Sequence, residues 1–338
     1  MSIRRRINTG IVDIWITNNS NDVNVVGSLR WAVAQASNTL PTVIKVSPDF
    51  IDLAGVGRNM YVADSKVTNI FGGGSIVKDI TIDFSYINVL FGTGGFFQGA
   101  ENITSPTFKF QNIVVENQDF GTTSTVLFSN RIDLTNCRFE NLVRNSSLGF
   151  FHYLVTSTFT NCIFRNMVNN ASGKTTIHFN TGNSTFTDCI FEDTGRVYVS
   201  NNPVINITRT YINISESFMT QEGFFPIFNF SQCYIRNNGT STAVSIFSRN
   251  YGSFTNCTLV NVRISTASGY GEKLSNIRHC TQIYTLPITA STVLNVISNT
   301  LAHTIQNNIF ISPNSNNIFP TNLTSLTESN NLYLSFCR

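Results

Sequence analysis

Hydrophobic and polar positions along this chain follow a pattern that returns about every 24 residues. The recurring phrase has eight slots: Phe or Leu, Thr, Asn, Cys, any residue, an apolar residue, any residue, and Asn. It is clearest at 134–141, 159–166, 186–193, 230–237 and 254–261. Weaker copies occupy 110–117, 207–214, 277–284 and 305–312. A repeat of this length predicts a stack of equivalent structural units.

The pattern inside each unit predicts β-strands. The apolar segments are short, β-branched and aromatic, Asn, Gly and Ser separate them, and no segment shows the 3.6-residue period of a helix. A second column of short apolar segments is expected about ten residues upstream of slot four, at 126–129, 176–179, 226–229 and 245–248. One unit cannot bury its inner face alone, so successive units should pair as parallel strands about 4.8 Å apart. The sequence therefore predicts an all-β protein, a right-handed parallel β-helix with coils of about 24 residues.

The slots also predict which side chains form the core. Slots one, four and six should point inward, and Asn or Asp at slots three and eight should occupy left-handed turns. Six cysteines fall in slot four: Cys137, Cys162, Cys189, Cys233, Cys257 and Cys280. We expect a ladder of small buried thiols there, in preference to disulfides or a metal site. Cys337 lies outside the ladder, and its role as a reactive or an intermolecular thiol is open.

The N-terminal region resembles a known family. The segment 27–36 (GSLRWAVAQA) and the apolar segments 42–46 and 51–53 resemble the opening of bacterial surface β-helix proteins of the pectate-lyase-like superfamily. The segments 67–74 and 80–83 resemble the first coils of that family. The resemblance implies a short amphipathic helix that caps the open end of the core. The residues themselves predict Ser28 as the N-cap of this helix, with Leu29, Val33 and Ala36 on one face. The superfamily includes lyases, hydrolases, adhesins and phage tailspikes, so the resemblance implies an architecture and no particular activity.

Composition limits the classes of protein that the chain can belong to. With 12% charged residues, a net charge of +3 and 41% hydrophobic residues, the chain favours a folded core over disorder and does not favour nucleic acid as a partner. No stretch approaches the ~20 apolar residues of a membrane span. We expect one domain over 1–338, with an N-terminal strand and cap region at 1–60, regular coils at 61–285, and irregular last coils with a C-terminal cap at 286–338. No cofactor or metal is expected.

Two groups of outward residues are candidates for chemistry. Glu140, Arg165 and Glu192 share slot seven, and the two carboxylates should lie two coils, or roughly 10 Å, apart. If the protein is an enzyme, these residues are the expected catalytic group. A charge ladder along a solvent-exposed face is the alternative, and it is favoured. Tyr211 and Tyr234 are neighbours in slot five and form a candidate ligand-binding pair for carbohydrate, with ordinary surface residues as the alternative.

These observations lead to an expectation about function. The architecture is used mainly outside cells, yet no apolar export segment follows Met1. Virion proteins reconcile these facts because they are made in the cytoplasm and released by lysis. We therefore expect a non-catalytic structural or host-attachment component of a virus particle, located in the virion. Its expected partners are other virion or surface proteins and a carbohydrate receptor, and similar tailspikes imply a homotrimer. The first alternative is a polysaccharide-degrading lyase or glycoside hydrolase, and the next is a bacterial surface adhesin, either of which would be extracellular or at the cell surface.

Overall fold

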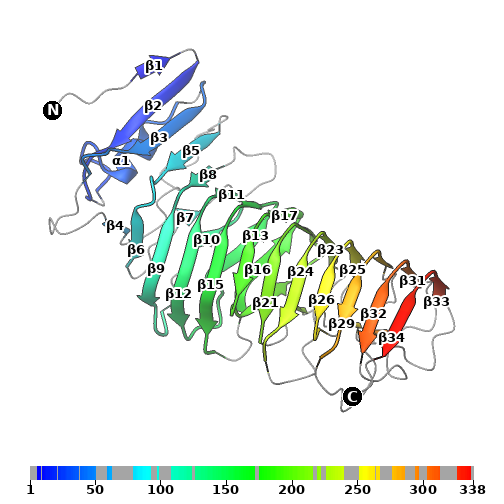
Figure 1. Cartoon of the computed structure of the whole chain (residues 1–338). Helices are drawn as coiled ribbons and strands as arrows, with labels where there is room; N and C mark the ends of the chain where they lie inside the picture. The colour runs from blue at the N-terminus through cyan, green and yellow to red at the C-terminus, as the bar shows by residue number, and fades with distance from the viewer. Residues whose placement is uncertain are drawn as a thin grey trace. The chain divides into compact units, whose positions relative to one another are not determined.

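The structure is a computed structural model that describes residues 6–8, 10–20, 22–37, 39–50, 59–62, 79–92, 97–98, 108–123, 126–171, 175–215, 219–221, 226–239, 251–262, 264–266, 276–285, 294–296, 303–312 and 326–335. The chain divides into two compact units, Met1–Ile177 and His178–Arg338, and each is described by itself. In each unit, Figure 1 shows short strands stacked side by side as successive coils.

The described residues of the first unit form strands of three sheets and one short helix. The first sheet runs in the order β1 (Arg6–Asn8), β2 (Ile11–Ile16), β3 (Thr42–Val46), β5 (Ile80–Asp83), β8 (Phe108–Gln111), β11 (Ile132–Thr135) and β14 (Thr158–Thr160). The second contains β4 (Asn59–Val62), β6 (Asn88–Phe91), β9 (Val114–Asp119), β12 (Arg138–Arg144) and β15 (Ile163–Asn169). The third contains β7 (Phe97–Gln98), β10 (Phe128–Ser129) and β13 (Phe151–Val155), and the helix is α1 (Leu29–Ala34). Apart from the antiparallel β1–β2 pair, the neighbouring strands described in this unit are parallel.

The second unit repeats this arrangement. Its first sheet contains β17 (Asn183–Thr187), β20 (Val204–Thr208), β23 (Ile227–Ser231), β25 (Tyr251–Thr255), β28 (Asn276–Arg278), β31 (His303–Gln306) and β33 (Leu326–Ser329). Its second contains β18 (Ile190–Glu192), β21 (Tyr211–Ile214), β24 (Tyr234–Asn237), β26 (Thr258–Val260), β29 (Thr281–Ile283), β32 (Ile309–Ser312) and β34 (Leu332–Ser335). Two further parallel pairs join β19 (Arg196–Val199) to β22 (Met219–Gln221) and β27 (Ile264–Thr266) to β30 (Leu294–Val296). The units divide within β16 (Thr175–Thr181).

The strand register confirms the predicted repeat. Leu134 lies opposite Phe110 on one side and Phe159 on the other, so residues of slot one stack coil on coil. In the first unit, the hydrogen-bonded asparagines of slot three are 24 and 25 positions apart, at Asn112, Asn136 and Asn161. In the second unit the corresponding steps are 21, 23 and 24 positions. The protein is therefore all-β and folds as a parallel β-solenoid, as the sequence predicts.

Aromatic side chains fill the core of each unit. In the first unit the stacked rings of Phe139 and Phe164 lie 5.5 Å apart with an interplanar angle of 11°. In the second, Phe230 and Phe254 stack at 4.9 Å and 7°. Complete burial of each such ring stabilises the fold by roughly 1.5–3 kcal/mol relative to exposure. Because parallel pairing places equivalent residues directly over one another, an aromatic residue in slot one or six of one coil meets its counterpart in the next.

The six cysteines of slot four form the predicted thiol ladder. All six are buried and free. In each coil the thiol donates a hydrogen bond, 3.2–3.4 Å long, to the carbonyl oxygen two residues earlier. The intervening slot-three residue is left-handed in every case, as at Asn136 with φ 55° and Asp188 with φ 56°. The same carbonyl oxygen also accepts a backbone N–H from slot three of the preceding coil, as Thr135 does from Asn112 and Thr255 from Gln232, so the thiol adds a second hydrogen bond to it. Cys337 lies outside the described residues.

The N-terminal helix has the predicted N-cap. The Ser28 hydroxyl accepts a hydrogen bond of 3.0 Å from the backbone N–H of Trp31. Leu29, Ala32 and Val33 are the buried residues of the helix. The expectation for Ala36 is wrong, because the helix ends at Ala34 and Ala36 is only half-buried. That this helix caps the core stays a prediction, and the family-like segments at 51–53 and 67–74 lie outside the described residues.

The predicted second column is wrong in part. The segment 126–129 enters β10 of the third sheet and 176–179 lies in β16. The segment 226–229 instead enters β23 of the first sheet, where Phe228 lies opposite Ile205 and two residues before Phe230 of slot one. β23 begins at Ile227, three residues before slot one, so Ile227 and Phe228 belong to the same strand as Phe230 and not to a separate one. The segment 245–248 lies outside the described residues. The single domain and its internal boundaries stay predictions.

Candidate functional site

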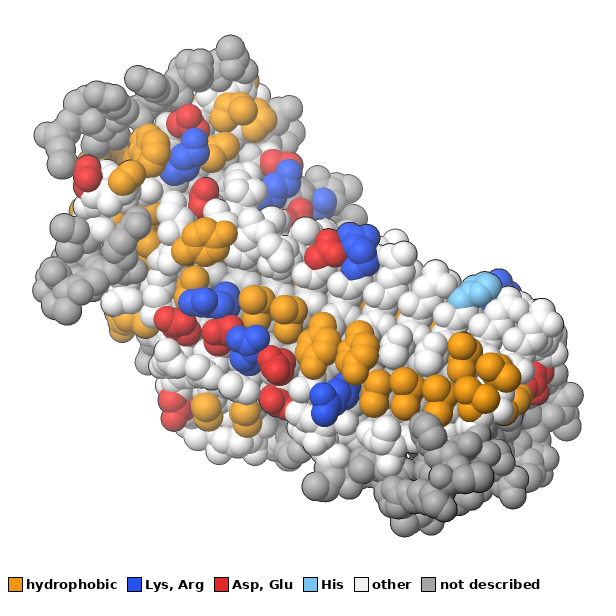
Figure 2. Space-filling model, viewed as in Figure 1, with side chains coloured by type: hydrophobic (Ala, Val, Ile, Leu, Met, Phe, Trp, Pro, Cys, Tyr) orange, Lys and Arg blue, Asp and Glu red, His pale blue; other side chains and the backbone are white. Residues whose placement is uncertain are grey.

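A row of alternating charges runs across the outward face of β9, β12 and β15 in the first unit. Parallel pairing places Glu140 between Glu116 and Arg165 in neighbouring coils, and Arg138 lies two residues before Glu140 on β12. Figure 2 shows these acidic and basic side chains gathered on one face. Slots five and seven point to the same side of a strand, so they contribute to one row. We call Glu116, Arg138, Glu140 and Arg165 the charge ladder.

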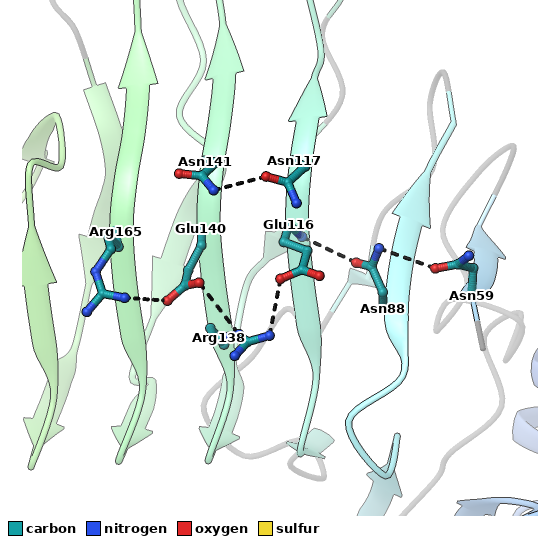
Figure 3. Close-up of polar contacts among 8 residues, drawn as sticks. All are labelled: Asn59, Asn88, Glu116, Asn117, Arg138, Glu140, Asn141 and Arg165. Atoms are coloured by element: carbon teal, nitrogen blue, oxygen red, sulfur yellow. Dashed lines mark hydrogen bonds and ion pairs between the residues drawn. The ribbon is translucent and has the colours of Figure 1, made fainter. Parts of the chain in front are cut away.

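Every member of the charge ladder contacts a member of opposite charge. Arg138 Nη2 donates to Glu116 Oε2 at 3.1 Å, and its Nε lies 3.7 Å from Glu140 Oε2. Arg165 Nη1 donates to Glu140 Oε1 at 2.9 Å. Figure 3 shows the Arg138 guanidinium between the two carboxylates. Glu140 is the most enclosed of the four, with a side chain 15% exposed, and both of its oxygens face arginines.

The ladder separates the two carboxylates that could act together. Glu116 and Glu140 lie opposite each other on adjacent strands, a pair that the sequence argument passed over in favour of Glu140 and Glu192. Two carboxyl groups flanking a glycosidic bond can hydrolyse it. Arg138 contacts both carboxylates and lies between them, where the scissile bond or an attacking water would have to be. The geometry therefore supports a structural charge ladder better than a catalytic pair.

The remaining predicted residues lie in the second unit. Glu192 is on β18, where it lies opposite Asn213 of β21. Tyr211 and Tyr234 are register partners on β21 and β24, with ring centroids 5.6 Å apart and planes within 8°. The tyrosine pair is thus brought together as expected. Each ring covers one face of the other, so only the outer faces of the pair remain for a ligand.

Asparagines form two further ladders in the first unit. At slot three, Asn136 Nδ2 donates to Asn112 Oδ1 at 3.3 Å and Asn161 Nδ2 donates to Asn136 Oδ1 at 2.8 Å. At slot eight, Asn117, Asn141 and Asn166 make the same contacts at 2.9 and 3.0 Å, and Figure 3 includes the first of these. All six residues have φ between 49° and 56°. Asn tolerates this conformation and also offers both a donor and an acceptor, which explains its recurrence at these slots.

The corresponding bend of the second unit carries an ion pair. Asp188 and Arg209 occupy slot three of successive coils, and the guanidinium donates twice to the carboxylate, at 2.7 and 2.8 Å. These hydrogen bonds lower the pKa of Asp188 and raise that of Arg209. Both groups are exposed, so the pair acts mainly by fixing the geometry of the bend.

A buried cation in the first unit was missed by sequence reasoning. Arg144, the last residue of β12, is fully buried and lies over the ring of Phe150 at 5.1 Å. Its guanidinium donates to the carbonyl oxygens of Gly149 at 2.6 Å and Thr123 at 3.2 Å. Burial lowers its pKa to about 10. Alternation along β12 could have indicated this inward position, because Leu142 two residues earlier is also buried.

His152 lies in the same unit, and burial and the charge of Arg144 both contribute to its lowered pKa. Burial, followed by repulsion from Arg144, lowers the pKa of His152 from 6.5 to about 4. Its ring meets that of Tyr153 edge-on, with centroids 4.2 Å apart. The imidazole is therefore neutral at physiological pH in the folded protein.

The described residues contain no group of three or more His, Cys, Asp or Glu side chains arranged to hold a metal ion. Within the same part of the chain, no helix has the length and apolar character needed to cross a bilayer. No protein-family model, curated protein or solved structure matches this sequence. The assignment of a function therefore depends on the geometry of the coils.

Proposed function

We propose that the chain is a non-catalytic structural or host-attachment component of a virus particle, such as a fibre, a spike or a capsid accessory protein. The observation that carries this proposal is the use of outward polar side chains as coil-to-coil ladders. The asparagine ladders and the charge ladder each join three successive coils of the first unit. A surface whose polar groups hold neighbouring coils together suits a scaffold that has to survive outside a cell.

The resemblance of the N-terminal segments extends the proposal to membership of the pectate-lyase-like superfamily. A parallel β-solenoid with coils of about 24 residues is compatible with that assignment. The superfamily includes phage tailspikes as well as enzymes, so the choice between them has to come from the outward residues. In this chain those residues favour the attachment role. A homotrimer and a carbohydrate receptor belong to the same proposal by analogy.

The thiol ladder supports folding in a reducing compartment. Cys233, Cys257 and Cys280 occupy successive coils, and all three are free. The hydrogen bond with Cys257 and burial raise the pKa of Cys233 well above its usual range, so that thiol stays protonated. Chains that fold in oxidising compartments usually carry disulfides, and adjacent thiols would be exposed to mispairing there. Assembly in a cytoplasm before release by lysis fits these cysteines better than export as a secreted enzyme or adhesin.

A polysaccharide-degrading enzyme is the second candidate, and the Glu116–Glu140 pair on adjacent strands favours it. The purified chain would be incubated with a panel of polysaccharides, and new reducing ends would be measured. We expect none. Release of reducing ends that disappears in Glu140→Gln but persists in Glu192→Gln would replace the proposed function with glycoside hydrolysis at this pair.

The proposed function is tested by fractionation of the native source. Nuclease-resistant particles that contain nucleic acid would be purified on a density gradient, and the chain would be quantified in every fraction by mass spectrometry. We expect co-sedimentation at a fixed ratio to the main capsid protein. Recovery of the chain only in secreted or cell-envelope fractions would overturn the proposal and favour a surface adhesin.

A further inference from the structure

A depression of about 370 Å³ opens on the surface of the first unit beside the charge ladder. Its lining combines an aromatic ring, a guanidinium, two amides and apolar groups, from Tyr86, Arg138, Asn136, Asn161, Val114 and Ile163. The volume lies at the lower end of the range for small-ligand sites, which is roughly 300–1,000 Å³. A lining that combines polar and apolar groups can recognise a ligand with one apolar and one polar side.

Tyr86 is held at this depression by a turn that breaks the regular coil. Four residues, 84–87, join β5 to β6, whereas only 112 and 113 join β8 to β9 in the next coil. Ser85 and Tyr86 are consecutive left-handed residues with φ of 50° and 60°. This conformation is costly for a bulky side chain, and such strain collects at ligand sites.

Hydrogen bonds hold the strained turn in place. The Tyr86 backbone N–H donates to the Asn112 carbonyl oxygen at 2.8 Å, and the Ser85 N–H donates to Asp83 Oδ1 at 2.9 Å. The Tyr86 side chain is 63% exposed, the highest value among the large apolar and aromatic side chains of the described residues. The turn thus stabilises an aromatic ring that contributes little to the core.

Arg138 supplies directed donors on the other side of the depression. A guanidinium has five N–H groups, and within the described part of the chain Arg138 makes one hydrogen bond, to Glu116, and one ionic contact with Glu140. Those contacts fix its orientation and leave donors for a ligand. The charge ladder contains two acidic and two basic residues and is neutral as a group. A neutral ligand suits this environment better than an anionic one.

We propose that this depression binds one neutral hexose residue of a glycan. The apolar C–H face of a pyranose ring packs on the exposed Tyr86 ring, while Arg138 and Oδ1 of Asn161, at the end of the slot-three ladder, hydrogen-bond its hydroxyl groups. The proposal deepens the attachment role, on which its biological meaning rests. It also places the sugar site in the first unit, whereas the Tyr211–Tyr234 pair that the sequence singles out belongs to the second.

The test measures binding of neutral oligosaccharides to the full chain by ligand-observed NMR and calorimetry. The probes are oligosaccharides from partial hydrolysis of dextran, mannan and galactan, with oligogalacturonate as the anionic comparison. Tyr86→Asn removes the ring but keeps a residue that tolerates the left-handed turn, and Arg138→Gln removes the guanidinium. Tyr234→Ser is the matched control. Circular dichroism establishes whether each variant folds. If Tyr86→Asn does not fold, Arg138→Gln alone still tests the site.

We expect at least one neutral probe to bind, and each site variant to weaken that binding by about ten-fold or more. Tyr234→Ser should leave the affinity unchanged. Undiminished binding by a folded site variant, loss of binding in Tyr234→Ser, or binding of the anionic probe alone would overturn the hexose site. Failure of every probe would do the same. None of these results changes the outcome expected from particle fractionation, so the sugar site and the attachment role are tested independently.

Discussion

At the scale of single residues, the left-handed asparagines are the clearest link between sequence and fold. Asn141 has φ of 54°, donates to Asn117 Oδ1 at 2.9 Å and accepts from Asn166 Nδ2 at 3.0 Å. The residue therefore combines two roles, tolerance of a conformation that most residues avoid and a pair of coil-to-coil hydrogen bonds. The Asn141 side chain is exposed to water, which competes for its hydrogen bonds. Its tolerance of positive φ should therefore contribute more to stability than its hydrogen bonds do.

A pair of substitutions at Asn141 separates these roles. We expect Asn141→Ala to lower the free energy of unfolding by about 1–2 kcal/mol, because Ala is strained at positive φ and the amide contacts are lost. Asn141→Gly loses the same contacts without the strain and should cost about half as much. Urea denaturation followed by circular dichroism measures both. Equal losses for the two variants would show that the hydrogen bonds matter more than the turn.

His152 predicts a dependence of stability on pH. Its pKa is about 4 in the folded chain and 6.5 in the unfolded chain, so the unfolded state binds the proton more readily between these values. The folded state is therefore favoured fully above pH 6.5 and loses stability as the pH falls from 6.5 to 4. Allowing for partial exposure, the loss should be about 1–2 kcal/mol.

The measurement is the urea midpoint of unfolding between pH 4 and 7. His152→Gln should reduce the slope across this window, whereas His279→Asn, at an exposed left-handed position, should leave it unchanged. An unaltered slope in His152→Gln would assign the acid sensitivity to carboxylates instead.

At the scale of strands, the charge ladder joins β9, β12 and β15 but contributes little to the free energy of unfolding. Its arginines and Glu116 are between 32% and 44% exposed, and ion pairs in such positions are weak. A double-mutant cycle with Glu140→Gln and Arg165→Gln should give a coupling of about 0.3–1 kcal/mol. Salt at 1 M should reduce that coupling, because it screens exposed charges. A salt-independent coupling above about 2 kcal/mol would indicate a desolvated pair with a function of its own.

Strand-level features explain why the sequence predicted some parts of the fold and missed others. Slots one, three, four and six recur in each clear copy, so the inward phenylalanines, the thiol ladder and the left-handed bends could be identified without a structure. Arg138 was missed because slot five holds Val114 and Ile163 in the neighbouring coils, and no column of charge appears in the repeat. Tyr86 lies in a turn longer than its counterpart in the next coil, where no slot predicts its position.

At the scale of the whole molecule, each unit is a series of coils that contact mainly their nearest neighbours. Such solenoids are stabilised by the sum of coil energies and of the interfaces between coils. A coil near an end of the described stack has fewer neighbouring coils to hold it, so it should open more often than a coil in the middle. The last described coil of the second unit agrees with this view, since Tyr333 is 37% exposed although its register partner Phe310 in the preceding coil is 1% exposed.

The buried thiols allow this expectation to be measured, because the labelling rate of each thiol reports how often its own coil opens. Cys233 and Cys280 are 3% and 1% exposed, so a thiol reagent can reach them only when a coil opens. Under native conditions, pulse labelling followed by peptide mass spectrometry should modify Cys280, in a coil nearer the C-terminal end of the described stack, faster than Cys233. In urea all seven cysteines of the chain should label rapidly. Identical native rates at the two positions would mean that the second unit opens as one cooperative body, and the nearest-neighbour description would then fail.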